Sequence, residues 1–168
     1  MRNLDEYIPE LSNKEKILKI TEKIVNIELK IDKYESKRPV IKQCIKEMEN
    51  KMFRLHKRSL EYPKNQKIGN EIEDTESKLK KGIKILNGLN DKIIRKEIAL
   101  IKLKQERKKE IKSGLTEYMG KINSRYEKLQ EEEIRDNEPH EDRKNELEKI
   151  KMEIEHIKRL INTEFNGK

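Results

Sequence analysis

The sequence predicts an all-α fold: an elongated antiparallel coiled-coil hairpin of helices over about residues 12–62 and 70–135, with a third helix, over about 140–165, packed on its base. Three observations predict this fold. Apolar residues recur at alternating spacings of three and four, two polar turns divide the chain, and 44% of residues are charged while 32% are hydrophobic. A 3.5-residue repeat keeps one stripe of a helix against its neighbour, which is typical of a coiled coil.

The first helix carries the clearest seam. The seam is interrupted at Arg38 and continues in the same register through Pro39. Because a loop would usually shift the register, we expect Pro39 to kink this helix rather than break it. Ser12 and Glu15 have the spacing of a capping box, which predicts where the helix begins. The seam residues are Ile17, Ile20, Ile24, Ile27, Ile31, Tyr34, Ile41, Ile45, Met48, Met52 and Leu55.

The second helix follows a turn over residues 63–70, where Pro, Gly and Asn occur without periodicity. Asn70 and Glu73 are spaced to cap this helix. Glycines inside the helix are expected to mark close helix approach or local breaks; they are Gly82, Gly88, Gly114 and Gly120. The predicted apolar stripe consists of Ile72, Leu79, Ile83, Leu86, Leu89, Ile93, Ile94, Ile98 and Ile101.

A second turn, Asp136–Pro139, precedes the third helix, whose apolar residues return to the same spacing. Folding the chain about residues 66 and 138 would place residue 17 near residue 115 and residue 37 near residue 95. The second helix would then extend beyond the start of the first, and the third helix would cover this end. The first and second helices both widen their apolar stripes there, as a helix with two neighbours needs. A parallel dimer of long helices is the competing arrangement, and the two turns disfavour it.

The first 11 residues are expected to form an irregular leader, and residues 12–168 a single helical domain. Apolar residues in the leader predict either docking on the base of the bundle or a short motif that binds another protein; they are Leu4, Tyr7, Ile8 and Leu11. The sequence does not decide between these two alternatives.

The composition favours a soluble intracellular protein of the cytoplasm or nucleus, with no membrane association. The longest apolar runs are too short for a transmembrane helix, and the N-terminus resembles neither a signal peptide nor a transit peptide. Cys44 is the single cysteine, which suits a reducing compartment.

The net charge of +8 is unevenly spread. Residues 37–58 contain eight Lys or Arg against two acids, residues 92–112 nine against three, and residues 127–148 ten acids against four bases. The two basic stretches predict a band that contacts nucleic-acid phosphates without reading bases, or an acidic protein. A solvated coiled-coil exterior explains the same charges. The candidate band is Lys37, Arg38, Lys42, Lys92, Arg95 and Lys96.

The sequence offers no local signature of catalysis, and we expect no enzyme activity, cofactor or metal. Phosphate-binding loops, nucleophile elbows and metalloprotease motifs are missing from it. Glu153 and His156 have the Glu-x-x-His spacing used by di-iron bundles, but the companion ligands that such a site needs are lacking. No histidine lies at helical spacing from Cys44 that could activate its thiol.

These features predict a non-enzymatic structural or adaptor subunit that mediates protein–protein assembly in a larger complex. The alternative is a basic coiled-coil accessory factor that binds the nucleic-acid backbone in a ribosomal, recombination or chromatin context. A third hypothesis is a small bundle that inhibits or regulates another macromolecule. The expected partners are other protein subunits, with the chain itself a monomeric hairpin or a homodimer.

Overall fold

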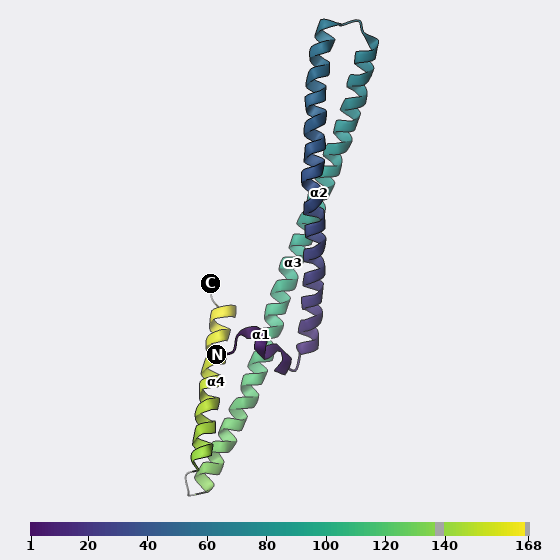
Figure 1. The fold of residues 1–168 in the computed structure, drawn as a ribbon. Helices are drawn as coiled ribbons and strands as arrows, with labels where there is room; N and C mark the ends of the chain where they lie inside the picture. Colours follow the sequence, from purple (N-terminus) through teal and green to yellow (C-terminus); the bar gives the residue numbers. More distant parts are fainter. Residues whose placement is uncertain (137–139, 167–168) are drawn as a thin grey trace. The chain divides into compact units, whose positions relative to one another are not determined.

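The chain forms four α-helices and one 3-10 helix in the computed structural model, which describes residues 1–136 and 140–166 (Figure 1). In chain order the elements are α1 (Leu4–Tyr7), η1 (Ile8–Glu10), α2 (Lys14–Glu61), α3 (Gln66–Arg135) and α4 (Glu141–Phe165). The described residues contain no strand, and no helix among them is long and apolar enough to cross a membrane. The predicted all-α class, the hairpin of α2 and α3, and the additional helix packed on it are confirmed.

The chain divides into two compact units. Unit 1 comprises Met1–Lys23 and Lys102–Lys168, and unit 2 comprises Ile24–Ile101. Unit 2 is therefore the hairpin of α2 and α3 around their connecting turn. Unit 1 holds the start of α2, the second half of α3, α4 and the N-terminal segment. The sequence predicted one domain after residue 11.

The turn between α2 and α3 is shorter than predicted. It occupies residues 62–65, and α3 begins at Gln66 because Asn65 caps it. The Asn65 Oδ1 atom accepts hydrogen bonds from the backbone N–H of Lys67 at 3.1 Å and of Ile68 at 3.4 Å. The predicted cap at Asn70 is therefore wrong, because this residue already lies within the first turns of α3. The second predicted turn, Asp136–Pro139, falls mostly outside the described residues.

The start of α2 also differs from the predicted capping box. The Ser12 hydroxyl donates instead to Glu117 Oε2 on α3 at 2.7 Å, and the Asn13 side-chain amide donates to the carbonyl oxygen of Glu110 at 2.8 Å. These two polar residues therefore attach the start of α2 to α3. Further along, α2 continues through Pro39 without a break.

All eleven residues of the predicted α2 seam are buried or half-buried. The facing stripe of α3 was predicted less well. Ile83, Ile94, Ile98 and Ile101 are between 41% and 57% exposed. The buried or half-buried line through α3 instead includes small and polar residues, namely Thr75, Gly82, Lys96 and Arg107.

The pairing in unit 2 follows from Gly82. A side chain at this position would meet Ile45 Cγ1 at 3.3 Å and Met48 Cε at 3.4 Å, so the glycine allows close approach of the two helices. Lys37 precedes Ile45 by eight residues. Because the helices are antiparallel, it falls opposite the position eight residues after Gly82, about residue 90, and not opposite residue 95 as predicted. The hydrophobic cluster of unit 2 fits the same pairing, which puts its members Tyr34 and Ile27 opposite Ile93 and Leu100.

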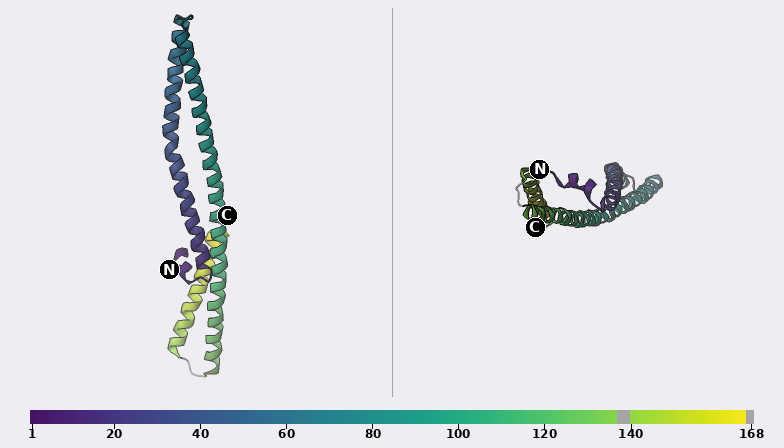
Figure 2. Two further views of the ribbon diagram at one scale, coloured as in Figure 1. Left: turned by 90° about the vertical axis from the view of Figure 1, so that its right-hand side faces the viewer. Right: turned by 90° about the horizontal axis from the view of Figure 1, so that it is seen from below.

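Unit 1 is built around a core to which the N-terminal segment belongs. The core residues are Tyr7, Ile8, Leu11, Ile17, Ile111, Leu115 and Ile157. Ile17 and Leu115 thus belong to one core cluster, and α4 folds back along α3 to contribute Ile157 (Figure 2). The segment expected to be irregular is helical over residues 4–10 and docks on this core, with Tyr7 only 1% exposed.

Candidate partner-binding surfaces

An exposed apolar stripe lies on α3 in unit 2, and we call it the Ile98 face. It comprises Ile94, Ile98 and Ile101, which are 50–57% exposed. Spacings of three and four residues put them on one stripe. Val25 and Leu29 are similarly exposed on α2, but Leu29 and Ile98 each lie midway between two seam residues and therefore point away from each other. Half-exposed aliphatic residues gathered on one stripe are typical of a surface that binds another protein.

The border of the Ile98 face carries charges of both signs. Asp91 precedes Ile98 by one heptad, and Glu97 directly follows the seam residue Lys96; both carboxylates are exposed. Arg95 lies three residues before Ile98 on the same helix surface and is exposed as well. The face is therefore apolar in the centre, with mixed charge around it.

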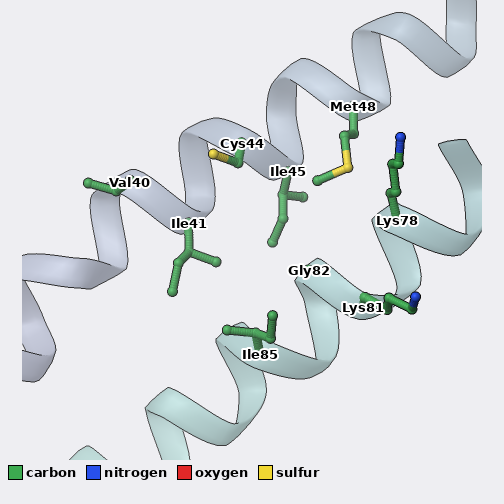
Figure 3. Close-up of a pocket in the computed structure, with 9 residues that line it drawn as sticks. All are labelled: Val40, Ile41, Cys44, Ile45, Met48, Lys78, Lys81, Gly82 and Ile85. Carbon is green, nitrogen blue, oxygen red and sulfur yellow. The ribbon is translucent and has the colours of Figure 1, made fainter.

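A second apolar surface, the Gly82 groove, lies within unit 2 as well (Figure 3). It has a volume of about 390 Å³ and is lined by Val40, Ile41, Cys44, Ile45, Met48, Lys78, Lys81, Gly82 and Ile85. Gly82 lines the groove where the two helices approach closely, while Val40 and Ile85 project from the helices and are 64% and 59% exposed. The Cys44 thiol is exposed at its edge.

Lysines mark the four corners of the Gly82 groove. Lys37 and Lys51 lie one heptad before and after Cys44, and Lys78 and Lys92 lie one heptad before and after Ile85. Positions one heptad apart share a flank, so these lysines continue the two edges of the groove. Lys78 pairs with Asp74 at 2.9 Å, and that pairing lowers the pKa of the Asp74 carboxyl. The groove is thus apolar in the centre, with these lysines and the acids Glu47 and Asp74 along its edges.

The two surfaces lie on different sides of unit 2. Groove residues such as Cys44 and Ile85 directly precede seam residues, whereas Ile94 of the Ile98 face directly follows one. An antiparallel helix pair has a pseudo-two-fold axis normal to the plane of the pair, so the same flank of both helices faces the same side. The groove and Ile94 therefore lie on different sides of unit 2, and each side carries charges of both signs.

The six residues of the predicted basic band do not share one face. Lys37, Lys92 and Arg95 are exposed on the groove side, and Lys42 is exposed on the opposite flank of α2. Arg38 and Lys96 occupy seam positions and are half-buried. The Arg38 Nε atom is buried and has no hydrogen-bond partner among the described residues. These positions give Arg38 and Lys96 a place in helix pairing rather than on an open binding surface.

Glu153 and His156 of the Glu-x-x-His pair both contact the N-terminal segment in unit 1. The His156 Nε2 atom lies 2.6 Å from the carbonyl oxygen of Arg2, and Glu153 Oε1 lies 4.0 Å from the Arg2 guanidinium. Arg2 also donates to Glu10 at 2.6 Å and lies over the ring of Tyr7. The described residues bring no three His, Cys, Asp or Glu side chains together as a metal site. The pair therefore holds the N-terminal segment.

No family model, curated protein or solved structure matches this chain. What its two surfaces bind is therefore inferred from their shape and charge. The sequence analysis predicted neither surface, because it placed the isoleucines of the Ile98 face on the seam of the second helix. The Ile98 face could have been predicted from the number of apolar residues in α3, which is larger than one narrow seam can bury.

Proposed function

We propose that the chain is a non-enzymatic adaptor of the cytoplasm or nucleus that joins other protein subunits through the apolar surfaces of unit 2. The observation that carries this proposal is the Ile98 face, where three isoleucine side chains of α3 remain about half exposed along one stripe. Burying apolar area contributes roughly 25 cal/mol per Å², so a partner helix laid along this face would bind favourably. The nucleic-acid backbone offers no apolar counterpart to these side chains.

Affinity capture from the native cell tests the proposal with three forms of the chain: wild type, Ile98→Asp, and Leu60→Asp. Leu60 is 85% exposed and outside both surfaces, so its variant controls for the general effect of a new carboxylate. We expect wild type and the Leu60 variant to retain the same partner proteins, and the Ile98 variant to lose them by roughly 30-fold or more in affinity, as for a central interface residue. Equal capture by all three forms, or no specific capture by wild type, would refute the proposal.

The second candidate function is binding to the nucleic-acid backbone. It is favoured by the exposure of Lys37, Lys92 and Arg95 on one side of unit 2. Phosphate contacts of this kind would carry no sequence preference.

A further inference from the structure

The Ile98 face repeats the positions of α3 that pack against α4 in unit 1. Three heptads after its isoleucines come three residues of the unit 1 core, namely Leu115, Met119 and Ile122. Leu115 shares a cluster with Ile157 of α4, and Met119 lines one pocket with Ile154. Residues that are whole heptads apart on one helix occupy the same position of the repeat. The Ile98 face is therefore spaced like a surface that a helix covers.

The two sets of residues differ in what covers them. In unit 1, α4 buries isoleucines at the same spacing, each at most 9% exposed; they are Ile150, Ile154 and Ile157. Leu115 is 0% exposed, whereas Ile94, three heptads earlier, is 52% exposed. The chain thus supplies a second helix to the unit 1 positions, and the described residues leave those of the Ile98 face exposed.

We propose that the Ile98 face binds an amphipathic helix of another protein, laid antiparallel to α3 as α4 is in unit 1. This inference rests on the proposed function, since it gives the class and the orientation of a partner at the same surface. Isoleucine or leucine side chains of that helix, at spacings of three and four, would cover Ile94, Ile98 and Ile101. Recognition of an amphipathic helix through such anchors is a recurring mode of protein binding.

The contacts of α4 show which charges a helix bound in this way brings to α3. Tyr118 of α3 donates a hydrogen bond to Glu153 at 3.4 Å, on one flank of the positions that α4 covers. Thr116, on the other flank, lines a pocket together with Lys158 of α4. A helix with the charges of α4 therefore places an acid over the position of Tyr118 and a base over that of Thr116.

Three heptads earlier, these two positions are charged. Glu97 corresponds to Tyr118 and Arg95 to Thr116, and both charged side chains are exposed. A helix with the charges of α4 would set its acid against Glu97 and its base against Arg95, and like charges in contact disfavour binding. The helix that fits the Ile98 face therefore carries the reverse pattern, with a base toward Glu97 and an acid toward Arg95. Charge thus distinguishes the partner helix from α4 itself.

Two synthetic peptides, added to the full chain, test the inference. The α4 peptide has the sequence of residues 141–166, and the exchanged peptide carries Glu153→Lys and Lys158→Glu in that sequence, so both have the same net charge. Fluorescence anisotropy of the labelled peptides measures their affinity for the chain. We expect the exchanged peptide to bind roughly 10-fold more tightly than the α4 peptide, since two like-charge contacts become ion pairs.

Three variants of the chain locate the bound peptide. Ile98→Asp should weaken binding of the exchanged peptide by roughly 30-fold, as expected for a central interface residue, and Leu60→Asp should leave it unchanged. The third variant carries both Arg95→Glu and Glu97→Arg and should prefer the α4 peptide instead. All four positions are exposed, so the helices are expected to form, as circular dichroism will verify.

Three results would overturn the inference: no binding of the exchanged peptide at about 1 mM, the weak end of specific affinities; equal affinity of the Ile98 variant and wild type, which would place the peptide elsewhere; or equal affinity of the two peptides for wild type. The proposed function fails or stands separately. Partner proteins lost only by the Ile98 variant, with no peptide bound, would keep the adaptor and remove the helix assigned to it. Peptide binding with no protein captured would leave this inference standing and remove the adaptor function.

Discussion

The ring of Tyr7 packs edge-on against the ring of Tyr118, with centroids 5.8 Å apart and planes inclined by 64°. This contact joins the N-terminal segment to α3 in the core of unit 1. Edge-to-face aromatic pairs add about 0.5–1.5 kcal/mol beyond the area they bury. Burial also raises the pKa of both hydroxyls, and the carboxylate of Glu153 adds to the effect. The two rings therefore fix where the segment docks.

Truncating Tyr7 is expected to destabilise unit 1 strongly. Tyr7→Ala removes an aromatic side chain that is 1% exposed, and such changes cost about 3–5 kcal/mol. Tyr62→Ala is the matched control, because Tyr62 is 59% exposed and should change stability by less than about 0.5 kcal/mol. Urea unfolding followed by circular dichroism measures both. Equal effects of the two substitutions would show that the segment does not belong to the core.

Acid is expected to loosen the N-terminal segment and the start of α2 from α3. The pKa of Glu10 lies below its ordinary value of 4.5, chiefly because Arg2 donates a hydrogen bond to it. Lys16 similarly lowers the pKa of Glu110, and Ser12 that of Glu117. A carboxyl with a depressed folded pKa stabilises the fold fully above its unfolded value, and loses that contribution as pH falls through the folded value.

Hydrogen exchange over residues 4–17, measured at a series of pH values, checks this prediction. After correction for intrinsic exchange rates, protection should be constant above about pH 5 and should decline below about pH 4. The change will be modest because these ion pairs are exposed and screened by solvent. Glu10→Gln should flatten part of the decline. Protection that stays constant to low pH would show that these carboxylates do not support docking.

Alanine substitutions at two glycines of α3 are expected to change the stability of the chain in opposite directions. A methyl group at Gly114 would collide with Asn13 Oδ1 and would lie 3.0 Å from Leu11 Cδ1, whereas nothing lies within 4 Å of one at Gly88. Gly88→Ala should therefore stabilise the chain by about 0.5–1 kcal/mol through helix propensity. Gly114→Ala should destabilise it by about 1–3 kcal/mol through overpacking. Thermal unfolding of both variants decides; stabilisation at both positions would contradict the close approach at Gly114.

The sequence predicts the buried face of α2 better than that of α3. In α2 the seam positions are almost all apolar, so the repeat alone locates the buried face. In α3 a threonine, a glycine and two charged residues occupy the seam, while isoleucines beside it point outward. A search for apolar periodicity follows the isoleucines and therefore misplaces the stripe. Only the partner helix identifies Gly82 as a seam residue, since a glycine carries no hydrophobic signal.

The docking of the N-terminal segment could be foreseen only as one of two alternatives. Its four apolar residues have no helical repeat, and Pro9 argues against an α-helix. In the structure Pro9 lies at the start of η1, where a missing backbone N–H costs nothing. The polar anchors of the segment, Arg2 with Glu153 and His156, join residues about 150 positions apart. No local pattern can predict such a pairing.

Neutralising the groove-side cations tests the nucleic-acid alternative. If Lys37, Lys92 and Arg95 contact phosphates, affinity for generic RNA or DNA should fall linearly on a log–log plot against salt concentration. Replacing all three by Gln should weaken binding of any sequence and reduce the slope by about 2–3, since each duplex phosphate contact contributes about 0.9. Gln at Lys14, Lys19 and Lys23 is the matched control, because these exposed lysines lie in unit 1. A slope unchanged by the first replacement would place the contact elsewhere, and no binding at low salt would eliminate this function.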